Sequence, residues 1–135
     1  MIFLDANFLL AYFIEAETEH KVAIKIYEKI KNEQLIISNS IILEVMTVSN
    51  IKIKASKELL ETIFYALNNG EFGIVEDVPY INKGMDKLLN YLPERLPFFD
   101  CLYIEIMEQL RIKQIATFDK HFNNKGIEVI GQMNS

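Results

Sequence analysis

The sequence has no tryptophan, one cysteine, three prolines and five glycines in 135 residues. A lone cysteine, Cys101, excludes an internal disulfide framework and favours a reducing cytoplasm. The few glycines form no phosphate-cradling loop, which argues against a nucleotide-binding enzyme. No apolar run approaches the roughly 20 residues that span a bilayer, so no membrane segment is expected. A signal peptide is not expected either, because Asp5 and Asn7 interrupt the apolar start and no basic residues precede it.

The chain also lacks an excess of basic residues. Its 19 aspartates and glutamates outnumber its 14 lysines and arginines, which gives a net charge of −5. This balance disfavours a protein whose affinity for nucleic acid rests on a basic surface. It does not exclude an enzyme that acts on nucleic acid, because bound divalent cations would reverse the sign of the local field.

The order of apolar patterns predicts an α/β domain. Half of the residues are apolar, and no repeat or linker divides the chain, so a single domain over residues 1–135 is expected. Short buried runs predict strands, and amphipathic segments between them predict helices. The expected strands are residues 2–5, 34–38, 71–77, 114–117 and 127–130. The expected helices are residues 7–14, 18–32, 41–48, 55–69, 79–91 and 98–110. Ser38, Asn39 or Ser40 could cap the third of them. Such alternation favours a mostly parallel sheet with helices on both faces.

Four acidic residues stand out from the charged helix faces. Asp5 ends the first strand in "MIFLDANFLL", and Asp119 follows the fourth strand in "QIATFD". Glu44 lies among apolar residues in "SIILEVMTV", and Asp100 opens the helix that begins "FFDC". The carboxyl ends of parallel strands share one sheet edge, which is where ligands bind in open α/β sheets. These four carboxylates are therefore expected to meet in one cleft.

Each acid also has a plain structural explanation. Asp5 could cap a strand end, Asp100 could cap a helix, and Asp119 could close a turn. Glu44 within an apolar helix is harder to explain in this way. Taken together, four clustered carboxylates would repel one another and raise their pKa values. Divalent cations relieve such repulsion, and carboxylate oxygens suit Mg²⁺, with Mn²⁺ as an alternative.

The chain resembles the PIN-domain nucleases, and within them the VapC-type toxins of toxin–antitoxin pairs. The resemblance rests on the order and spacing of "IFLDAN", "SNSIILEV", "LPFFDCLYIEIMEQL" and "QIATFDKHF" and covers essentially the whole chain. It implies a three-layer α/β/α fold and an acidic metal site formed by Asp5, Glu44, Asp100 and Asp119. It also places supporting polar residues at Asn7, Ser40 and Thr117. Three positions depart from the family pattern, which usually has small residues or glycine there: Glu105, Met107 and Arg111.

The resemblance further implies an Mg²⁺-dependent endoribonuclease that leaves a 5′-phosphate. Its expected partners are an RNA substrate and a small cognate antitoxin that covers the acidic cleft. Abundant apolar residues on several helices also favour a homodimer. Zinc is not expected, because His20 and His121 have no second ligand at matching spacing. Asn7 is expected to cap the first helix. The asparagine at this position also argues against an aspartate-nucleophile phosphatase, because such enzymes need a second aspartate there. A non-catalytic PIN-like binding or assembly module is the alternative that remains open.

Overall fold

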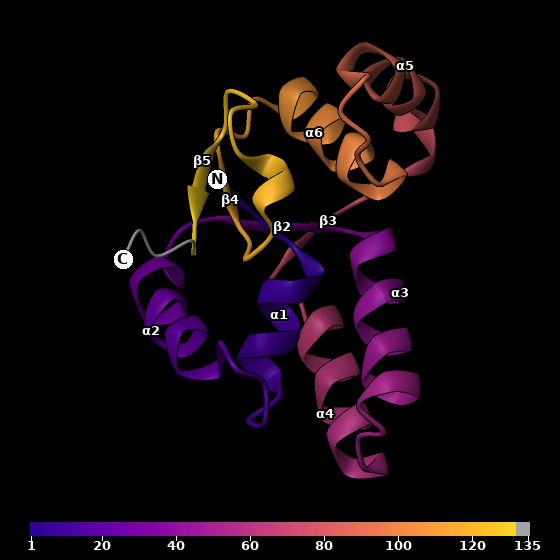
Figure 1. Ribbon diagram of the computed structural model, residues 1–135. Helices are drawn as coiled ribbons and strands as arrows, with labels where there is room; N and C mark the ends of the chain where they lie inside the picture. The colour runs from indigo at the N-terminus through magenta and orange to yellow at the C-terminus, as the bar shows by residue number, and fades with distance from the viewer. Residues whose placement is uncertain (132–135) are drawn as a thin grey trace.

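A five-stranded parallel sheet forms the centre of the computed structural model, which describes residues 1–131 (Figure 1). The strands lie in the order β3-β2-β1-β4-β5. Their bounds are β1 Ile2–Leu4, β2 Leu35–Ser38, β3 Gly73–Val75, β4 Gln114–Ala116 and β5 Glu128–Ile130. The central strands β1, β2 and β4 are almost wholly buried, as expected for apolar strands covered on both faces. The predicted α/β architecture is confirmed.

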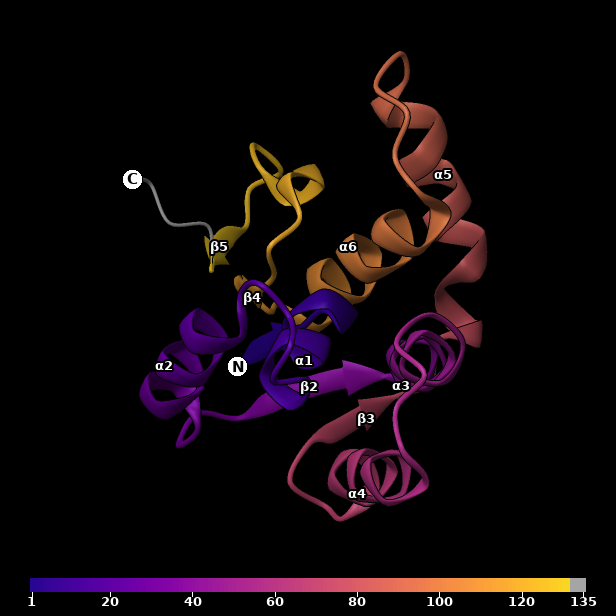
Figure 2. The same ribbon diagram turned by 60° about the horizontal axis from the view of Figure 1, so that its bottom comes forward.

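Six α-helices cover the sheet. Their bounds are α1 Ala6–Phe13, α2 His20–Ile30, α3 Asn39–Thr47, α4 Lys57–Asn68, α5 Ile81–Tyr91 and α6 Phe98–Leu110. Three short helical segments complete the described chain: η1 Val48–Lys52, η2 Val78–Tyr80 and η3 Lys120–Phe122. In Figure 1, α1 to α4 lie below the sheet and α5 and α6 lie above it, which gives three layers. Figure 2 shows β2 and β3 running side by side toward α3.

The core between the sheet and α6 is built from aromatic and aliphatic side chains. Residues 100–107 of α6 are all buried, so this helix has almost no solvent face. Tyr103 packs with its ring centroid 5.3 Å from that of Phe3 on β1. Full burial of a side chain of this size stabilises the fold by roughly 2–3 kcal/mol. Because α6 is held so firmly, Asp100 in its first turn has a fixed position relative to β1.

The predicted cap of the first helix was wrong, and the start of α3 is stabilised by a group from another strand. The first helix begins at Ala6, and its cap is Asp5 rather than Asn7, because the Asp5 side chain accepts a hydrogen bond from Ala6 N. At α3, Ser38 occupies the cap position without a side-chain cap bond. The carboxylate of Asp77, just after β3, instead accepts a hydrogen bond from Ser40 N. In both cases an aspartate at the carboxyl end of a strand stabilises the start of a helix.

The departures from the family pattern on α6 have structural consequences. Arg111 ends the helix in the left-handed conformation with φ 59°, the conformation that glycine adopts most readily. Glu105 is buried and accepts a hydrogen bond from Gln109. It also lies 3.8 Å from the amine of Lys87 on α5. A charged residue on α6 is thus satisfied by its neighbours at the α5–α6 contact.

The strand order reverses between β1 and β4. From β1 the chain moves outward through β2 to β3, whereas from β4 it moves the other way to β5. The crevice at such a reversal, beyond the carboxyl ends of the strands, is the usual ligand site of open α/β sheets.

No helix within residues 1–131 is long and apolar enough to cross a membrane.

Candidate active site

Asp5 lies at the point where the strand order reverses. Its backbone N–H donates to Ala116 O at 3.0 Å, so it bridges the ends of β1 and β4. Its side chain is buried, with Oδ1 accepting from Ala6 N at 2.9 Å and Oδ2 accepting from Thr117 Oγ1 at 2.8 Å. A buried carboxylate with two donors is held in one orientation.

Asn7 and Thr117 join the loop after β4 to the start of α1. Asn7 Oδ1 accepts from Phe118 N at 3.0 Å and lies 3.2 Å from Thr117 Oγ1. Thr117 Oγ1 in turn accepts from Asp119 N at 3.0 Å. The two side chains thus place Asp5 and Asp119 relative to each other. This explains why polar residues stand at these positions between apolar strands.

Asp100 and Glu44 approach this edge from opposite layers. Asp100 is buried in the first turn of α6, where the helix dipole favours a negative charge. Glu44 lies one turn after Ser40 on α3 and is half-buried. Ser40 and Glu44 both line a hollow of about 270 Å³ whose other residues are Leu43, Thr47, Val48 and Phe99.

The four carboxylates act on one another electrostatically. Desolvation by burial is the main cause that raises the pKa of Asp5 to about 7, and the charges of Asp100 and Glu44 add to it. Desolvation and the charge of Asp119 likewise raise the pKa of Asp100 to about 6. The pKa of Glu44 is raised by desolvation and by the charge of Asp119. The four carboxylates therefore form one electrostatically coupled cluster, and a bound cation would stabilise their charged forms.

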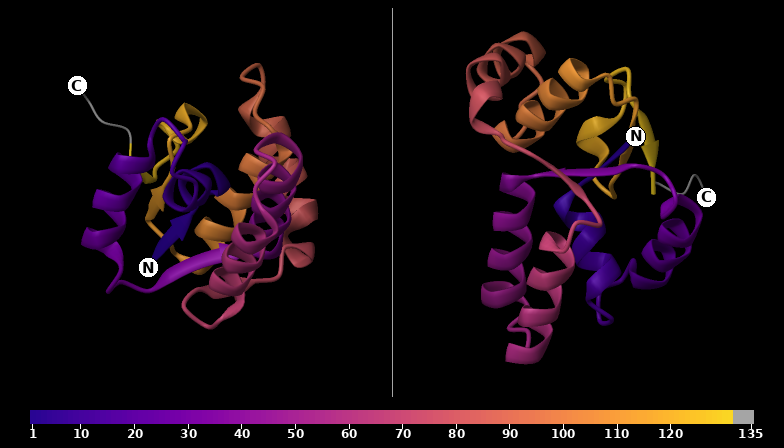
Figure 3. Two further views of the ribbon diagram at one scale, coloured as in Figure 1. Left: turned by 90° about the horizontal axis from the view of Figure 1, so that it is seen from below. Right: turned by 180° about the vertical axis from the view of Figure 1, so that it is seen from behind.

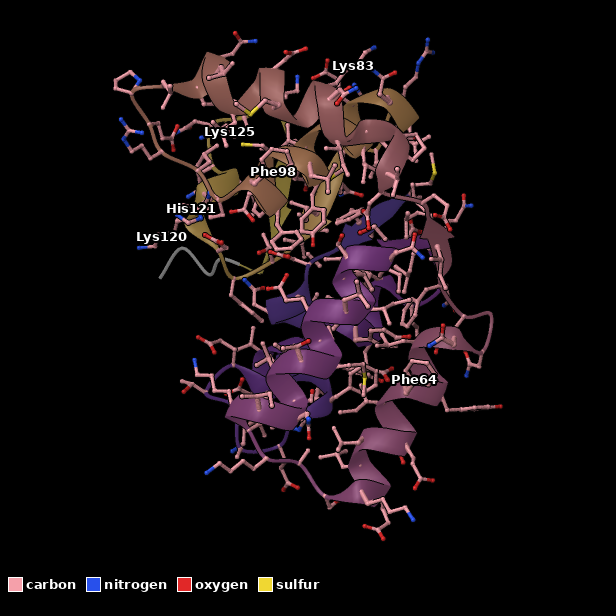
Figure 4. The ribbon with its side chains drawn as sticks, turned by 90° about the vertical axis from the view of Figure 1, so that its right-hand side faces the viewer. Phe64, Lys83, Phe98, Lys120, His121 and Lys125 are labelled. Atoms are coloured by element: carbon pink, nitrogen blue, oxygen red, sulfur yellow. The ribbon has the colours of Figure 1, made fainter. Side chains whose placement is uncertain are left out.

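His121 joins the acids, contrary to the expectation that it stands apart from any other ligand. Its Nδ1 lies 2.9 Å from Asp100 Oδ2 and 3.0 Å from Asp119 Oδ1. Figure 4 shows the position of His121. Ligand atoms of Asp100, Asp119 and His121 lie within 4.8 Å of one another, so these three side chains could hold a metal ion. His20, on α2, contacts Ala11 O instead.

Two buried or part-buried polar residues were missed in the sequence: His121, which is a functional candidate, and Asp77, which stabilises the start of α3. His121 is two residues after Asp119 and far from Asp100 along the chain, so only the tertiary fold reveals the contact. Asp77 had a readable signal, because it follows the "EFGIV" strand as Asp5 follows the first strand. It is buried, and its Oδ1 has no hydrogen-bond partner in the described part of the chain.

The family model described as "PIN domain" matches residues 2–128. No curated protein sequence matches the chain. The fold is similar to that of VapC20 from Mycobacterium tuberculosis, described as a toxin that cleaves the sarcin-ricin loop. The two are 16% identical over 94% of this chain and 96% of that one, with a TM-score of 0.83.

Two further solved structures share the fold. FitAcB from Neisseria gonorrhoeae is 15% identical, with 96% of each chain covered and a TM-score of 0.67. PAE2754 from Pyrobaculum aerophilum is 19% identical over 95% of this chain and 87% of that one, with a TM-score of 0.65. At these identities the likenesses show the fold alone. The family match, however, spans nearly all of the sequence, and the chain therefore belongs to the PIN-domain family.

Proposed function

We propose that this protein is a divalent-cation-dependent endoribonuclease and the toxin of a VapC-type toxin–antitoxin pair. The observation that carries the proposal is the convergence of Asp5, Glu44, Asp100 and Asp119 at the strand-order reversal of a PIN-domain sheet. RNA as the substrate is supported by the likeness to VapC20, described as cleaving the sarcin-ricin loop. Residues 1–135 would act as one domain in the cytoplasm.

The side chains at this edge fit a divalent cation. All four acids offer hard oxygen ligands, and their charges disfavour one another when no cation is bound. We assign Mg²⁺ as the ion, with Mn²⁺ as the alternative. Such an ion supplies an activated water and stabilises the charge that develops on the phosphate. Asp5, Glu44 and Asp100 would be its principal protein ligands, and Asp119 the more peripheral one.

The remaining polar residues would hold these ligands in place. Thr117 donates to Asp5 and accepts from the backbone of Asp119, so one hydroxyl orients two carboxylates. Asn7 fixes the loop between them through Phe118 N. Preorganised ligands of this kind need no rearrangement when substrate binds.

Cleavage of an end-labelled RNA by the purified protein tests the proposal. We expect internal cuts that leave 5′-phosphates in Mg²⁺ or Mn²⁺ and none in EDTA. Cleavage that is equal in EDTA would contradict the assignment. A protein that binds RNA or a protein partner tightly but cuts no RNA with either ion would support the non-catalytic PIN-like module instead.

The toxin role requires an antitoxin. The hollow beside Glu44 combines a carboxylate with the exposed side chains of Leu43 and Phe99, which are 67% and 50% exposed. A segment that carries both apolar and basic side chains would complement this surface. We expect expression of the chain to arrest growth and the small reading frame encoded beside it to restore growth. Unimpaired growth during expression of the active chain would contradict the toxin role.

We also propose a homodimer that forms through α5. This helix lies at the outside of its layer (Figure 3) and presents an exposed apolar stripe. The stripe consists of Ile81, Met85 and Leu89 on α5 and of Leu92 directly after its end, each 39% to 51% exposed. The spacing of four residues puts Ile81, Met85 and Leu89 on one helix face, as in helix pairs that bury such a stripe against each other.

Replacement of Leu89 tests the homodimer. We expect Leu89→Glu to convert the dimer to a monomer, because two carboxylates would face each other across the apolar contact. Light scattering coupled to size-exclusion chromatography measures the change. Tyr65→Glu on α4, at a side chain that is 70% exposed, is the matched control and should leave the dimer intact. A dimer that survives Leu89→Glu, or is lost only with Tyr65→Glu, would place the interface elsewhere.

A further inference from the structure

His121 is held firmly beside the acidic cluster. It belongs to the short segment η3, which the Asp119 side chain caps by accepting from His121 N at 2.9 Å. The next residue, Phe122, is completely buried and anchors this turn in the core. The side chain of His121 therefore lies where the backbone directs it, on the same side of the molecule as the start of α6 (Figure 4).

The distances around its Nδ1 match a coordination shell. Nδ1 lies 2.9 Å from Asp100 Oδ2, 3.0 Å from Asp119 Oδ1 and 3.1 Å from Asp119 Oδ2. Adjacent ligands of an octahedral ion with bonds of about 2.1 Å are about 3.0 Å apart. The ligand atoms of the three side chains also all lie within 4.8 Å of one another, so an ion could bind Nδ1 and one oxygen from each carboxylate.

The same distances also fit a charged imidazole that donates hydrogen bonds to both carboxylates. Burial works to lower the pKa of His121, but the hydrogen bond with Asp100 and the charges of Asp119 and Asp100 outweigh it and raise the pKa. In that arrangement the charged imidazole would neutralise the carboxylates only while no cation is present, and it would move away when the cation binds. The two arrangements differ in whether nitrogen touches the bound ion.

We propose that His121 Nδ1 is itself a ligand of the cation and that it makes the site prefer Mn²⁺ to Mg²⁺. The inference rests on the proposed function only in that the acidic cluster binds a divalent cation. Mg²⁺ favours an all-oxygen shell, whereas imidazole nitrogen is a good ligand for transition metals. One nitrogen among the carboxylates thus shifts selectivity away from Mg²⁺ without changing the reaction.

Pulsed electron paramagnetic resonance of Mn²⁺ bound to the full chain tests this proposal directly. We expect modulation from a coordinated ¹⁴N nucleus, and its replacement by the ¹⁵N pattern when the protein is grown with ¹⁵N-labelled histidine. The chain has two histidines, and the other one, His20, contacts Ala11 O on α1. The signal should therefore survive His20→Asn and disappear in His121→Asn.

Calorimetry with Mn²⁺ and with Mg²⁺ gives the selectivity. We expect wild type to bind Mn²⁺ more tightly than Mg²⁺, and His121→Asn to reduce that preference by roughly tenfold or more, as for other changes at metal sites. Bound Mn²⁺ without nitrogen modulation in the wild-type protein would overturn the proposal while leaving the acidic site intact. Failure of either ion to bind the wild-type chain would overturn both this inference and the metal-dependent function.

Discussion

RNA cleavage by the Asp100→Asn protein is expected to fall by at least roughly 10²–10³-fold, as when a single group that stabilises the transition state is removed. Asp100 is buried in the first turn of α6, its Oδ2 lies 2.9 Å from His121 Nδ1, and burial and the charge of Asp119 raise its pKa. An amide keeps the shape of the side chain but loses the charge that attracts a cation. Cleavage rates measured at saturating Mg²⁺ and Mn²⁺ quantify the loss.

Asp86→Asn on α5 is the matched control for this change. Asp86 is exposed and lies outside the acidic cluster, so the same chemical substitution should leave cleavage at the wild-type rate. The far-ultraviolet circular dichroism spectrum should be unchanged in both variants. Wild-type cleavage by a folded Asp100→Asn protein would refute the role assigned to this carboxylate.

The Asp5→Asn protein is expected to be more stable than wild type when no cation is present. The pKa of Asp5 is about 7 in the folded protein, against an ordinary 3.8, chiefly because of burial. Between these two pH values the folded wild-type protein keeps a proton on Asp5 that the unfolded chain loses. The free energy of unfolding of the wild-type protein therefore falls as pH rises from about 4 to about 7. The difference between the two pKa values corresponds to about 4 kcal/mol of stability that the wild-type protein loses over this pH range. The amide of the variant forms weaker hydrogen bonds than the carboxylate, which lowers its gain in stability by about 1 kcal/mol.

Urea unfolding in EDTA measures this effect. At pH 8 we expect Asp5→Asn to raise the free energy of unfolding by about 3 kcal/mol, and below pH 4 to change it little. The hydroxyl of Thr117 can accept from the new amide while donating to Asn7, so the network around residue 5 can remain intact. Asp86→Asn again serves as the control, with wild-type stability expected at both pH values. A destabilised Asp5→Asn protein at pH 8 would show that the charge at this position supports the fold.

The fold could be predicted well because its strands are short, apolar and separated by amphipathic helices. The pattern around Tyr103 predicted a helix over residues 98–110, and α6 has those bounds. Helix starts were less predictable, because the deciding groups come from elsewhere in the chain. Asp77 reaches Ser40 N from a different strand, and no local pattern around residues 38–40 could indicate that contact.

The acidic residues of the candidate site were readable because carboxylates after apolar strands are unusual. Asp5 and Asp119 follow β1 and β4, which pair directly, so their proximity follows from parallel topology. His121 could not be found in this way. Its contact with Asp100 depends on how η3 packs against α6, which only the three-dimensional arrangement defines. The network of Asn7 and Thr117 was anticipated as polar support, but its hydrogen-bond partners were not.

The central claim is that the four carboxylates bind a divalent cation together. Anomalous diffraction from crystals soaked in Mn²⁺ tests it most directly, because the signal locates the ion without reference to activity. We predict a strong peak within coordination distance of Asp5, Glu44 or Asp100 carboxylate oxygens, absent from crystals of the Asp100→Asn protein. Well-ordered crystals of the wild-type protein with no peak at this edge of the sheet, or with a peak only elsewhere, would contradict the account.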